Sequence, residues 1–402
     1  MSSRWKAVGP GLLWAGAAIG GSHLVQSTRA GAGWGFGLLW AVVVILVLKY
    51  PFFEYAHRYT ASTGESLLHG YRRLGAWALW AFLAIAVVSA VINAAGVTLV
   101  AAALLGGLLG LAWPLPRLAL LVCGLVAAIL VGGRYRTLDR SMKVMIAALG
   151  ALTLAGVAVA VRHGPVGDLA APVPALWSAA GVAFLLALMG WMPAPLDIAV
   201  WSSLWTLAKN RADRRQVSVA DSRFDFQLGY WVTGVLAVAF VSFGALVMFG
   251  TGEAFSDNGI AFANQLADMY ARTLGGWTRW LIATVAFITM FSTSLTVCDG
   301  YARTLVGCWR LLRAGERWPD VDAAGGRAGY LAVLGAVMLS GWLIIAVWLS
   351  GLRALIDVAT ITAFLTAPVV GWLSFAAVRR DPVPPGERPG RGLSLLSWAG
   401  LV

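Results

Sequence analysis

Long runs of apolar residues divide this chain into regular segments. Short polar stretches separate ten such runs, at residues 8–30, 36–57, 76–110, 115–132, 142–162, 174–208, 227–250, 277–300, 329–349 and 354–378. Each run is long enough for a helix to cross a hydrocarbon core of about 30 Å. The run from Leu38 to Leu48 does not alternate as the strands of an outer-membrane barrel do. The pattern therefore predicts an all-α polytopic membrane protein.

Composition and charge support this interpretation. Only 12% of the 402 residues are charged and 59% are hydrophobic, whereas soluble domains contain about 25% charged residues. Of the 30 Lys and Arg residues, 23 lie in alternate loops, 6 lie on the other side, and Lys49 lies inside a run. The positive-inside rule then predicts a multi-pass protein of the cell (inner) membrane with a cytoplasmic N-terminus. The basic charge reflects topology, and we expect no nucleic-acid partner.

The sequence contains none of the common motifs for metal binding by cysteine pairs, zinc-protease activity or nucleotide binding. The three cysteines form no CxxC pair, and the chain has neither an HExxH motif nor a GxxxxGK[ST] nucleotide loop. We therefore predict no enzymatic activity, no cofactor and no ATP-driven pumping by this chain. The expected partners are the lipid bilayer and an ion or small-molecule substrate.

Helix-breaking residues interrupt two of the runs near mid-depth. The first run contains Gly20-Gly21-Ser22-His23, and the sixth contains Met192-Pro193-Ala194-Pro195. Paired breaks at corresponding places in two halves indicate an inverted-repeat transporter with a leucine-transporter-type fold. We expect a first five-helix repeat over residues 1–165, a second, inverted repeat over 166–380, and a connector with the start of an eleventh helix over 381–402.

The broken ends supply candidate substrate-binding groups. Free carbonyls near Met189 favour a cation. Ser22 either contacts substrate or caps the second half of the first span. Asp197 begins the second half of span six, where it serves substrate or stabilises the helix end. His23 is a ligand, a proton carrier or a packing residue, and Met192 offers a thioether suited to soft or borderline metals.

Three further polar residues are candidates for a proton route. Asn93 lies in span three, and Glu54 and Asp299 lie near the predicted cytoplasmic ends of spans two and eight. Ion pairs of Glu54 with Arg58 and of Asp299 with Arg303 are equally compatible with the spacing.

Several stretches resemble the Nramp metal-ion transporters, and in particular a divergent, Nramp-related branch. The resemblance rests on Gly9-Pro10-Gly11-Leu12-Leu13, on residues 26–40 with their Gly-Phe-Gly-Leu-Leu-Trp, and on Met192-Pro193 at the place of the family's Met-Pro-His signature. It implies a leucine-transporter-type fold of the APC superfamily, with broken first and sixth helices. It also implies secondary transport of metal ions.

The metal site departs from the family pattern. The family's Asp-Pro-Gly-Asn signature falls on Gly20-Gly21-Ser22-His23, so Gly20 replaces the principal carboxylate and His23 replaces the asparagine ligand. Met192 retains the methionine ligand, whereas Ala194 replaces the signature histidine. We expect a non-standard metal site built from His23, Met192 and Asp197.

The sequence thus predicts a secondary transporter, such as a symporter, that moves a divalent metal cation by alternating access. Two alternatives stay open. One is a transporter of a non-metal solute, such as a small organic cation enclosed by Trp14, Trp191 and Trp201 against Asp197. The other is a transporter-like sensor without flux.

Overall fold

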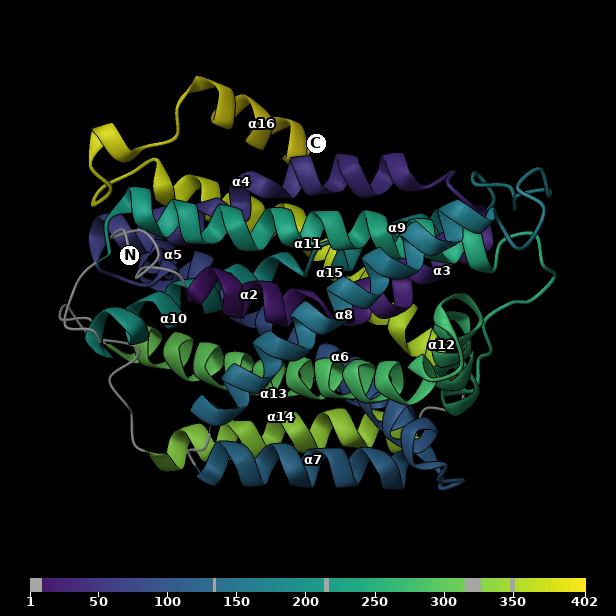
Figure 1. The fold of residues 1–402 in the computed structure, drawn as a ribbon. Coiled ribbons are helices and arrows are strands. Elements are labelled where there is room, and N and C mark those ends of the chain that lie inside the picture. The colour runs from purple at the N-terminus through teal and green to yellow at the C-terminus, as the bar shows by residue number, and fades with distance from the viewer. Residues whose placement is uncertain (1–8, 133–134, 213–216, 315–326, 348–350) are drawn as a thin grey trace.

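The computed structural model describes residues 9–132, 135–212, 217–314, 327–347 and 351–402, and every regular element in these ranges is a helix (Figure 1). In chain order they are α2 (Pro10–Ala18), η1 (Ser22–Ser27), α3 (Thr28–Trp34), α4 (Leu39–Thr63), α5 (Leu67–Leu74), α6 (Ala76–Leu109), α7 (Leu115–Gly132), α8 (Tyr135–His163), α9 (Ala179–Trp191), η2 (Leu196–Ile198), α10 (Ala199–Ala212), α11 (Val219–Val247), α12 (Gly259–Leu274), α13 (Thr278–Arg313), α14 (Arg327–Val347), α15 (Gly351–Val378), η3 (Pro385–Glu387) and α16 (Arg391–Leu401). The all-α prediction is confirmed.

The membrane-spanning segments follow the apolar runs. Among the described residues, eight helices are long and apolar enough to cross a membrane, with α9 and α10 counted together as Ala179–Arg211. Two predicted spans fall outside this count. The first is divided into short pieces by its break, and the fifth contributes the shorter apolar helix Ala147–His163. The polar stretch before α13 contains the surface helix α12, whose first amides are capped by the side chain of Asn258.

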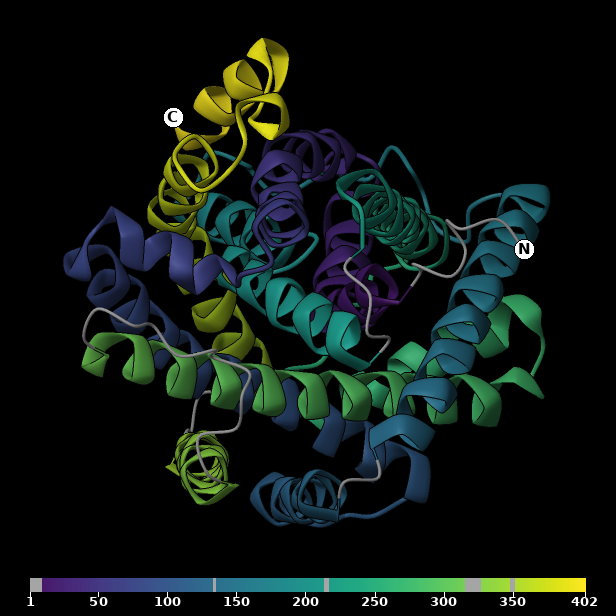
Figure 2. The same ribbon diagram turned by 90° about the vertical axis from the view of Figure 1, so that its left-hand side faces the viewer.

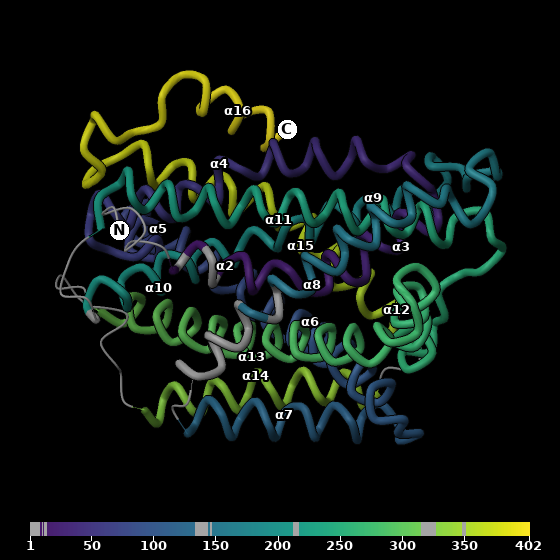
Figure 3. The backbone as a smooth tube through the Cα atoms, viewed as in Figure 1, coloured from purple at the N-terminus to yellow at the C-terminus, as the bar shows by residue number. Residues whose placement is uncertain are grey.

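The helices form a bundle around α6 and α13, which pack extensively against each other. Figures 1 and 2 show α7 and α14 together at one edge of this bundle, with α16 at the opposite edge. The trace in Figure 3 follows α11 along the bundle beside the first span. The carboxylate of Asp225 in α11 accepts hydrogen bonds from the amides of Gly9 and Gly11 at 2.9 and 2.6 Å. These bonds satisfy amides at the start of α2 and fix the first span against α11.

The break in the first span follows α2 at Ile19 and Gly20. The chain then continues as the six-residue π-helix η1, in which the backbone turns are wider than in an α-helix. A β-carbon on Gly20 would lie 2.6 Å from Oγ1 of Thr293 in α13, so any larger residue here would require the Thr293 side chain to move. The predicted break is confirmed.

The break in the sixth span is longer. Helix α9 ends at Trp191, four residues without helical structure follow, and the chain resumes in η2 and α10. Pro193 and Pro195 have no amide hydrogen to continue the helix. The carbonyls at the end of α9 therefore have no partners within their own helix. This segment packs against α15, where a β-carbon on Gly190 would overlap the Thr360 carbonyl.

Candidate functional site

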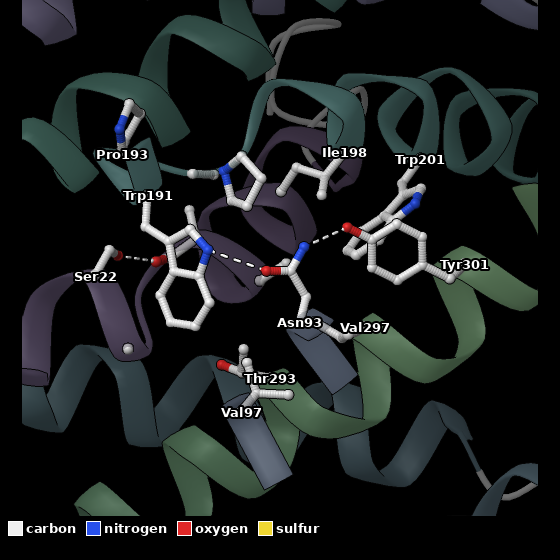
Figure 4. A pocket seen from close by; sticks show the side chains of 15 residues that line it. Ser22, Asn93, Val97, Trp191, Pro193, Ile198, Trp201, Thr293, Val297 and Tyr301 are labelled. Atoms are coloured by element: carbon white, nitrogen blue, oxygen red, sulfur yellow. Dashed lines mark hydrogen bonds between the residues drawn. The ribbon is translucent and has the colours of Figure 1, made fainter. Parts of the chain in front are cut away.

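A small cavity lies between the two breaks (Figure 4). The first break contributes Gly21 and Ser22, and the sixth contributes Trp191 and the Pro193–Pro195 segment. Elements α2, α6, η2, α10 and α13 supply the rest of its wall, namely Ala17, Ala18, Asn93, Val97, Ile198, Trp201, Thr293, Val297 and Tyr301. The wall is thus mostly apolar and aromatic, with few polar groups.

A chain of hydrogen bonds runs along this wall (Figure 4). The indole Nε1 of Trp191 donates to Oδ1 of Asn93 at 3.0 Å, and Nδ2 of Asn93 donates to the Tyr301 hydroxyl at 2.7 Å. That hydroxyl donates to Oδ2 of Asp197 at 2.8 Å, and the Ser89 side chain also bonds to this carboxylate. Each residue in this chain donates a hydrogen bond to the next, and the last acceptor is the Asp197 carboxylate. The network links α9, α6 and α13 to the second half of the sixth span.

Lys49 occupies the broken end of α9. Its ammonium donates to the carbonyls of Met189, Gly190 and Ala194 at 2.8, 2.7 and 3.2 Å. All three N–H groups of the ammonium are therefore used. Only 4% of Lys49 is exposed, and its charge interacts with that of Asp197. The cation that these carbonyls were expected to attract is present as a side chain of α4.

His23 faces away from the cavity and toward α11. Its Nδ1 lies 2.7 Å from the Ser22 hydroxyl, and its Nε2 donates to the carbonyl of Thr233 at 2.9 Å. Both ring nitrogens are thus engaged, so neither is free to bind a metal ion in this conformation. The predicted capping role of Ser22 is wrong. Ser22 lies inside η1, its hydroxyl donates to the Ala18 carbonyl at 2.7 Å, and no side chain caps that element.

The cavity wall includes only part of the predicted site. Of the expected substrate-binding residues, Ser22 lines the cavity, and so does Asn93 from the predicted proton route. The other expected substrate-binding residues do not line the cavity; these are Gly20, His23, Met189, Met192 and Asp197. Among the described residues, no group of three or more His, Cys, Asp or Glu side chains is placed to hold a metal ion.

The two acids of the predicted proton route lie in ion pairs. Glu54 contacts Arg58 at 2.6 Å and Arg223 at 3.5 Å, and the pair with Arg58 is almost fully buried. Asp299 accepts from Arg303 at 2.8 Å and from the Tyr330 hydroxyl at 2.6 Å. Each acid is therefore held by basic or hydroxyl partners.

A second polar cluster lies at the other end of the first span. The guanidinium of Arg29 in α3 donates to both carboxylate oxygens of Asp357 in α15, at 2.7 and 3.2 Å. Gln26 bridges the pair, because it accepts from Arg29 and donates to Asp357. Arg29 also lies 5.1 Å from the centre of the Phe184 ring in α9. The cluster joins α3, α9 and α15 on the side of the breaks away from the N-terminus.

Sequence reasoning missed Lys49, Tyr301 and Ser89 as site residues. A signal existed for Lys49, because a basic residue inside an apolar span is costly and commonly functional. For Tyr301 and Ser89 the sequence offers no comparable signal, since both are ordinary residues of long helices. Only the packing of α6 and α13 against the sixth span brings them to Asp197.

Together, the paired broken helices and the polar network between them define a membrane transporter with a leucine-transporter-type fold. The family model "Natural resistance-associated macrophage protein-like" (Nramp) matches residues 11–401. The chain therefore belongs to the Nramp-like family, and the resemblance seen in the sequence is confirmed.

Individual relatives agree with this assignment. "Uncharacterized protein PM0681" of Pasteurella multocida (strain Pm70) is 38% identical over 406 residues, which covers 100% of this chain and 89% of the relative. The Eremococcus coleocola manganese transporter, solved with an aromatic bis-isothiourea substituted compound, has a TM-score of 0.73 at 14% identity. The match covers 100% of this chain and 85% of the transporter chain. MhsT in complex with L-phenylalanine has a TM-score of 0.61 at 13% identity, with 97% and 95% coverage. At these identities the solved structures support the fold alone, and the predicted fold class is confirmed.

Proposed function

We propose that this protein is a secondary transporter that moves a divalent metal cation by alternating access through the cavity between its two broken helices. The observation that carries the proposal is the meeting of both breaks at one cavity, in a chain that matches the Nramp-like family over nearly its whole length. The manganese transporter among the structural neighbours supports a metal ion as the substrate class. We assign residues 1–165 and 166–380 to the two repeats, so that each contributes one broken helix.

The polar clusters support an alternating-access cycle. The cavity extends from the breaks to Trp201 in the first turn of α10 and to Tyr301 in the second half of α13. On the other side, the ion pair between Arg29 and Asp357 holds α3 against α15. Opening toward that side requires this pair to separate. We therefore assign the pair to the closed gate of this conformation.

The orientation follows from charge. The less numerous basic residues lie in the first or last turn of their helices; these are Arg29, Arg117, Arg162, Arg272, Arg279 and Arg353. Figure 1 shows two of these helices, α3 and α12, toward the same end of the bundle. The more numerous basic residues of the alternate loops belong at the other end. By the positive-inside rule, the N-terminal end is cytoplasmic and the cavity faces the cytoplasm in the inner membrane.

Metal coordination in this chain differs from the family pattern. Gly20 provides no carboxylate, and His23 is bound to α11. Met192 and Asp197 remain as candidate donors; they belong to the segment of residues 192–197, and neither lines the cavity. For either to reach the cavity, that segment must turn. We therefore expect weak, micromolar or poorer, manganese binding.

Uptake into proteoliposomes tests the proposal. Purified protein is reconstituted, and entry of Mn²⁺ down an imposed gradient is compared with that into protein-free vesicles, with and without a pH gradient. Saturable, protein-dependent entry supports the proposal. Entry indistinguishable from that of protein-free vesicles, for Mn²⁺, Fe²⁺ and Mg²⁺ alike, rejects it.

One observation favours a second function, transport of a small organic solute. Trp201 lines the cavity and is buried, and its indole N–H has no hydrogen-bond partner among the residues that the structure describes. A metal cation cannot accept this hydrogen bond, whereas a solute oxygen can. A thermal-shift screen separates the two functions, because stabilisation by organic solutes and not by metal salts identifies the solute as substrate.

A further inference from the structure

Lys49 is the feature of the structure that the proposed transport cycle does not use. It lies in the middle of α4, among apolar residues, and its ammonium leaves its own helix to reach the end of α9. Burying an ammonium without compensation is expensive, because water is lost as a solvating partner. A side chain kept in such a place therefore needs strong local partners.

The partners of this ammonium resemble the coordination of a free cation. Three carbonyl oxygens lie at 2.7–3.2 Å from one nitrogen. Two of them, from Met189 and Gly190, belong to the last turn of α9, where carbonyls have no helical partner and carry the negative end of the helix dipole. The third comes from Ala194 beyond the break. The charge of Asp197 adds a further attraction.

We propose that the broken end of α9 is a cation-binding site and that the Lys49 ammonium is its resident cation. A free cation of similar size occupies the three carbonyls only when the ammonium is absent. Because the ammonium balances the charge of Asp197, it also reduces the attraction of this region for a second cation. Lys49 thus restricts which cations the sixth break accepts. The inference rests on the proposed function only in treating this break as part of the transport site.

An alternative role for Lys49 is simple reinforcement of the helix end. Both roles predict that loss of Lys49 destabilises the protein, so stability alone does not separate them. The two roles differ in whether a small ammonium ion added to the solution can restore the lost stability. A vacated cation site accepts a small free ammonium ion, whereas a lost packing contact does not.

The experiment measures thermal unfolding of the purified full chain in detergent. Lys49→Ala removes the ammonium and leaves space where it stood, and methylammonium chloride is the probe. Tetramethylammonium chloride is the salt control, because it has no N–H groups and is larger. Leu46→Ala is the matched variant, since Leu46 is buried on the same helix one turn away and its side chain is a hydrocarbon without polar atoms.

We expect Lys49→Ala to unfold at a lower temperature than the wild type and to regain several degrees in methylammonium but not in tetramethylammonium. The wild type and Leu46→Ala should shift by less than a degree in either salt. Equal responses of Lys49→Ala and Leu46→Ala to methylammonium would overturn the proposal, as would an unaltered unfolding temperature of Lys49→Ala.

A second measurement covers a variant that does not survive purification. Lys49→Ala is then extracted in parallel with methylammonium or tetramethylammonium present throughout, and the monodisperse fraction is compared. Recovery in methylammonium alone supports the resident cation, and equal loss in both salts contradicts it. Neither measurement involves transport, so the result is independent of the proposed function. A protein that transports no metal ion can still be stabilised by methylammonium, and a protein that transports Mn²⁺ can fail to be.

Discussion

The two broken helices differ in where the polar groups at each break find their hydrogen-bond partners. In the first span the chain supplies its own partners, because the π-helix η1 restores backbone turns and the Ser22 hydroxyl bonds to the Ala18 carbonyl. In the sixth span the partners come from elsewhere, with Lys49 from α4 at the carbonyls and Tyr301 from α13 at Asp197. The first break is therefore locally satisfied, whereas the sixth depends on charged side chains of neighbouring helices.

This difference shows where function concentrates. A break closed by its own backbone offers few groups to a substrate, and the polar atoms of His23 are turned toward α11. A break held by a buried lysine and acid can change its charge and contacts during a transport cycle. Substitutions at the sixth break should therefore have larger effects than comparable substitutions at the first.

The largest effect is expected on stability, from Lys49→Met. Methionine keeps much of the length of the side chain but leaves three carbonyls without donors and Asp197 without its neighbouring charge. Removing one member of a buried charge pair costs about 3–5 kcal/mol. Thermal unfolding should show a large decrease. The double variant Lys49→Met/Asp197→Asn should recover part of it, and failure to recover would show that the two charges are not coupled.

The next effect is on uptake, from Asp197→Asn. Asparagine preserves the shape and can still accept the Tyr301 hydrogen bond, so the protein should insert and elute as a monodisperse species. Uptake should fall about tenfold or more, which corresponds to about 1.4 kcal/mol. Asp381→Asn is the control, because Asp381 is an acid exposed at the surface. Normal uptake by well-folded Asp197→Asn would reduce Asp197 to a stabiliser of the helix end.

A gain of manganese affinity should follow from restoring an acid to the first break. Gly20→Asp alone would crowd Thr293, so the variant is Gly20→Asp/Thr293→Ala, with Thr293→Ala as its control. A charged oxygen ligand favours Mn²⁺, and we expect affinity measured by titration calorimetry to rise about tenfold, or about 1.4 kcal/mol. Tight binding by the wild type, weakened in this variant, would contradict the assignment of Gly20 as the lost ligand position.

The smallest effect should come from Ser22→Ala. The variant loses a hydroxyl that bonds to Ala18 and His23, and a lost buried hydrogen bond costs about 1 kcal/mol. Ser294→Ala in α13 is the matched control, since its buried hydroxyl also donates to the carbonyl four residues earlier in the chain. Both should unfold at slightly lower temperatures with near-normal uptake. A loss of uptake as large as that of Asp197→Asn would remove the distinction between the two breaks.

The fold was predictable because membrane helices are encoded locally. Run length located the spans, and Gly20 and Pro193 located the breaks, since glycine and proline act on their own backbone. The partners of the breaks were not predictable in the same way. An α-helical reading of the first span cannot anticipate the π-helix that determines the direction of His23. The contact between Lys49 and the end of α9 joins residues about 140 positions apart and depends on how α4 packs.

The most direct test fills the cavity between the breaks. Val97→Trp places a large side chain from α6 into the cavity, and Val232→Trp adds the same side chain on the exposed face of α11. Initial rates of Mn²⁺ uptake are measured in matched proteoliposomes containing monodisperse protein. We predict that Val97→Trp abolishes uptake while Val232→Trp retains it. Full uptake by Val97→Trp would show that the substrate does not pass between the two broken helices.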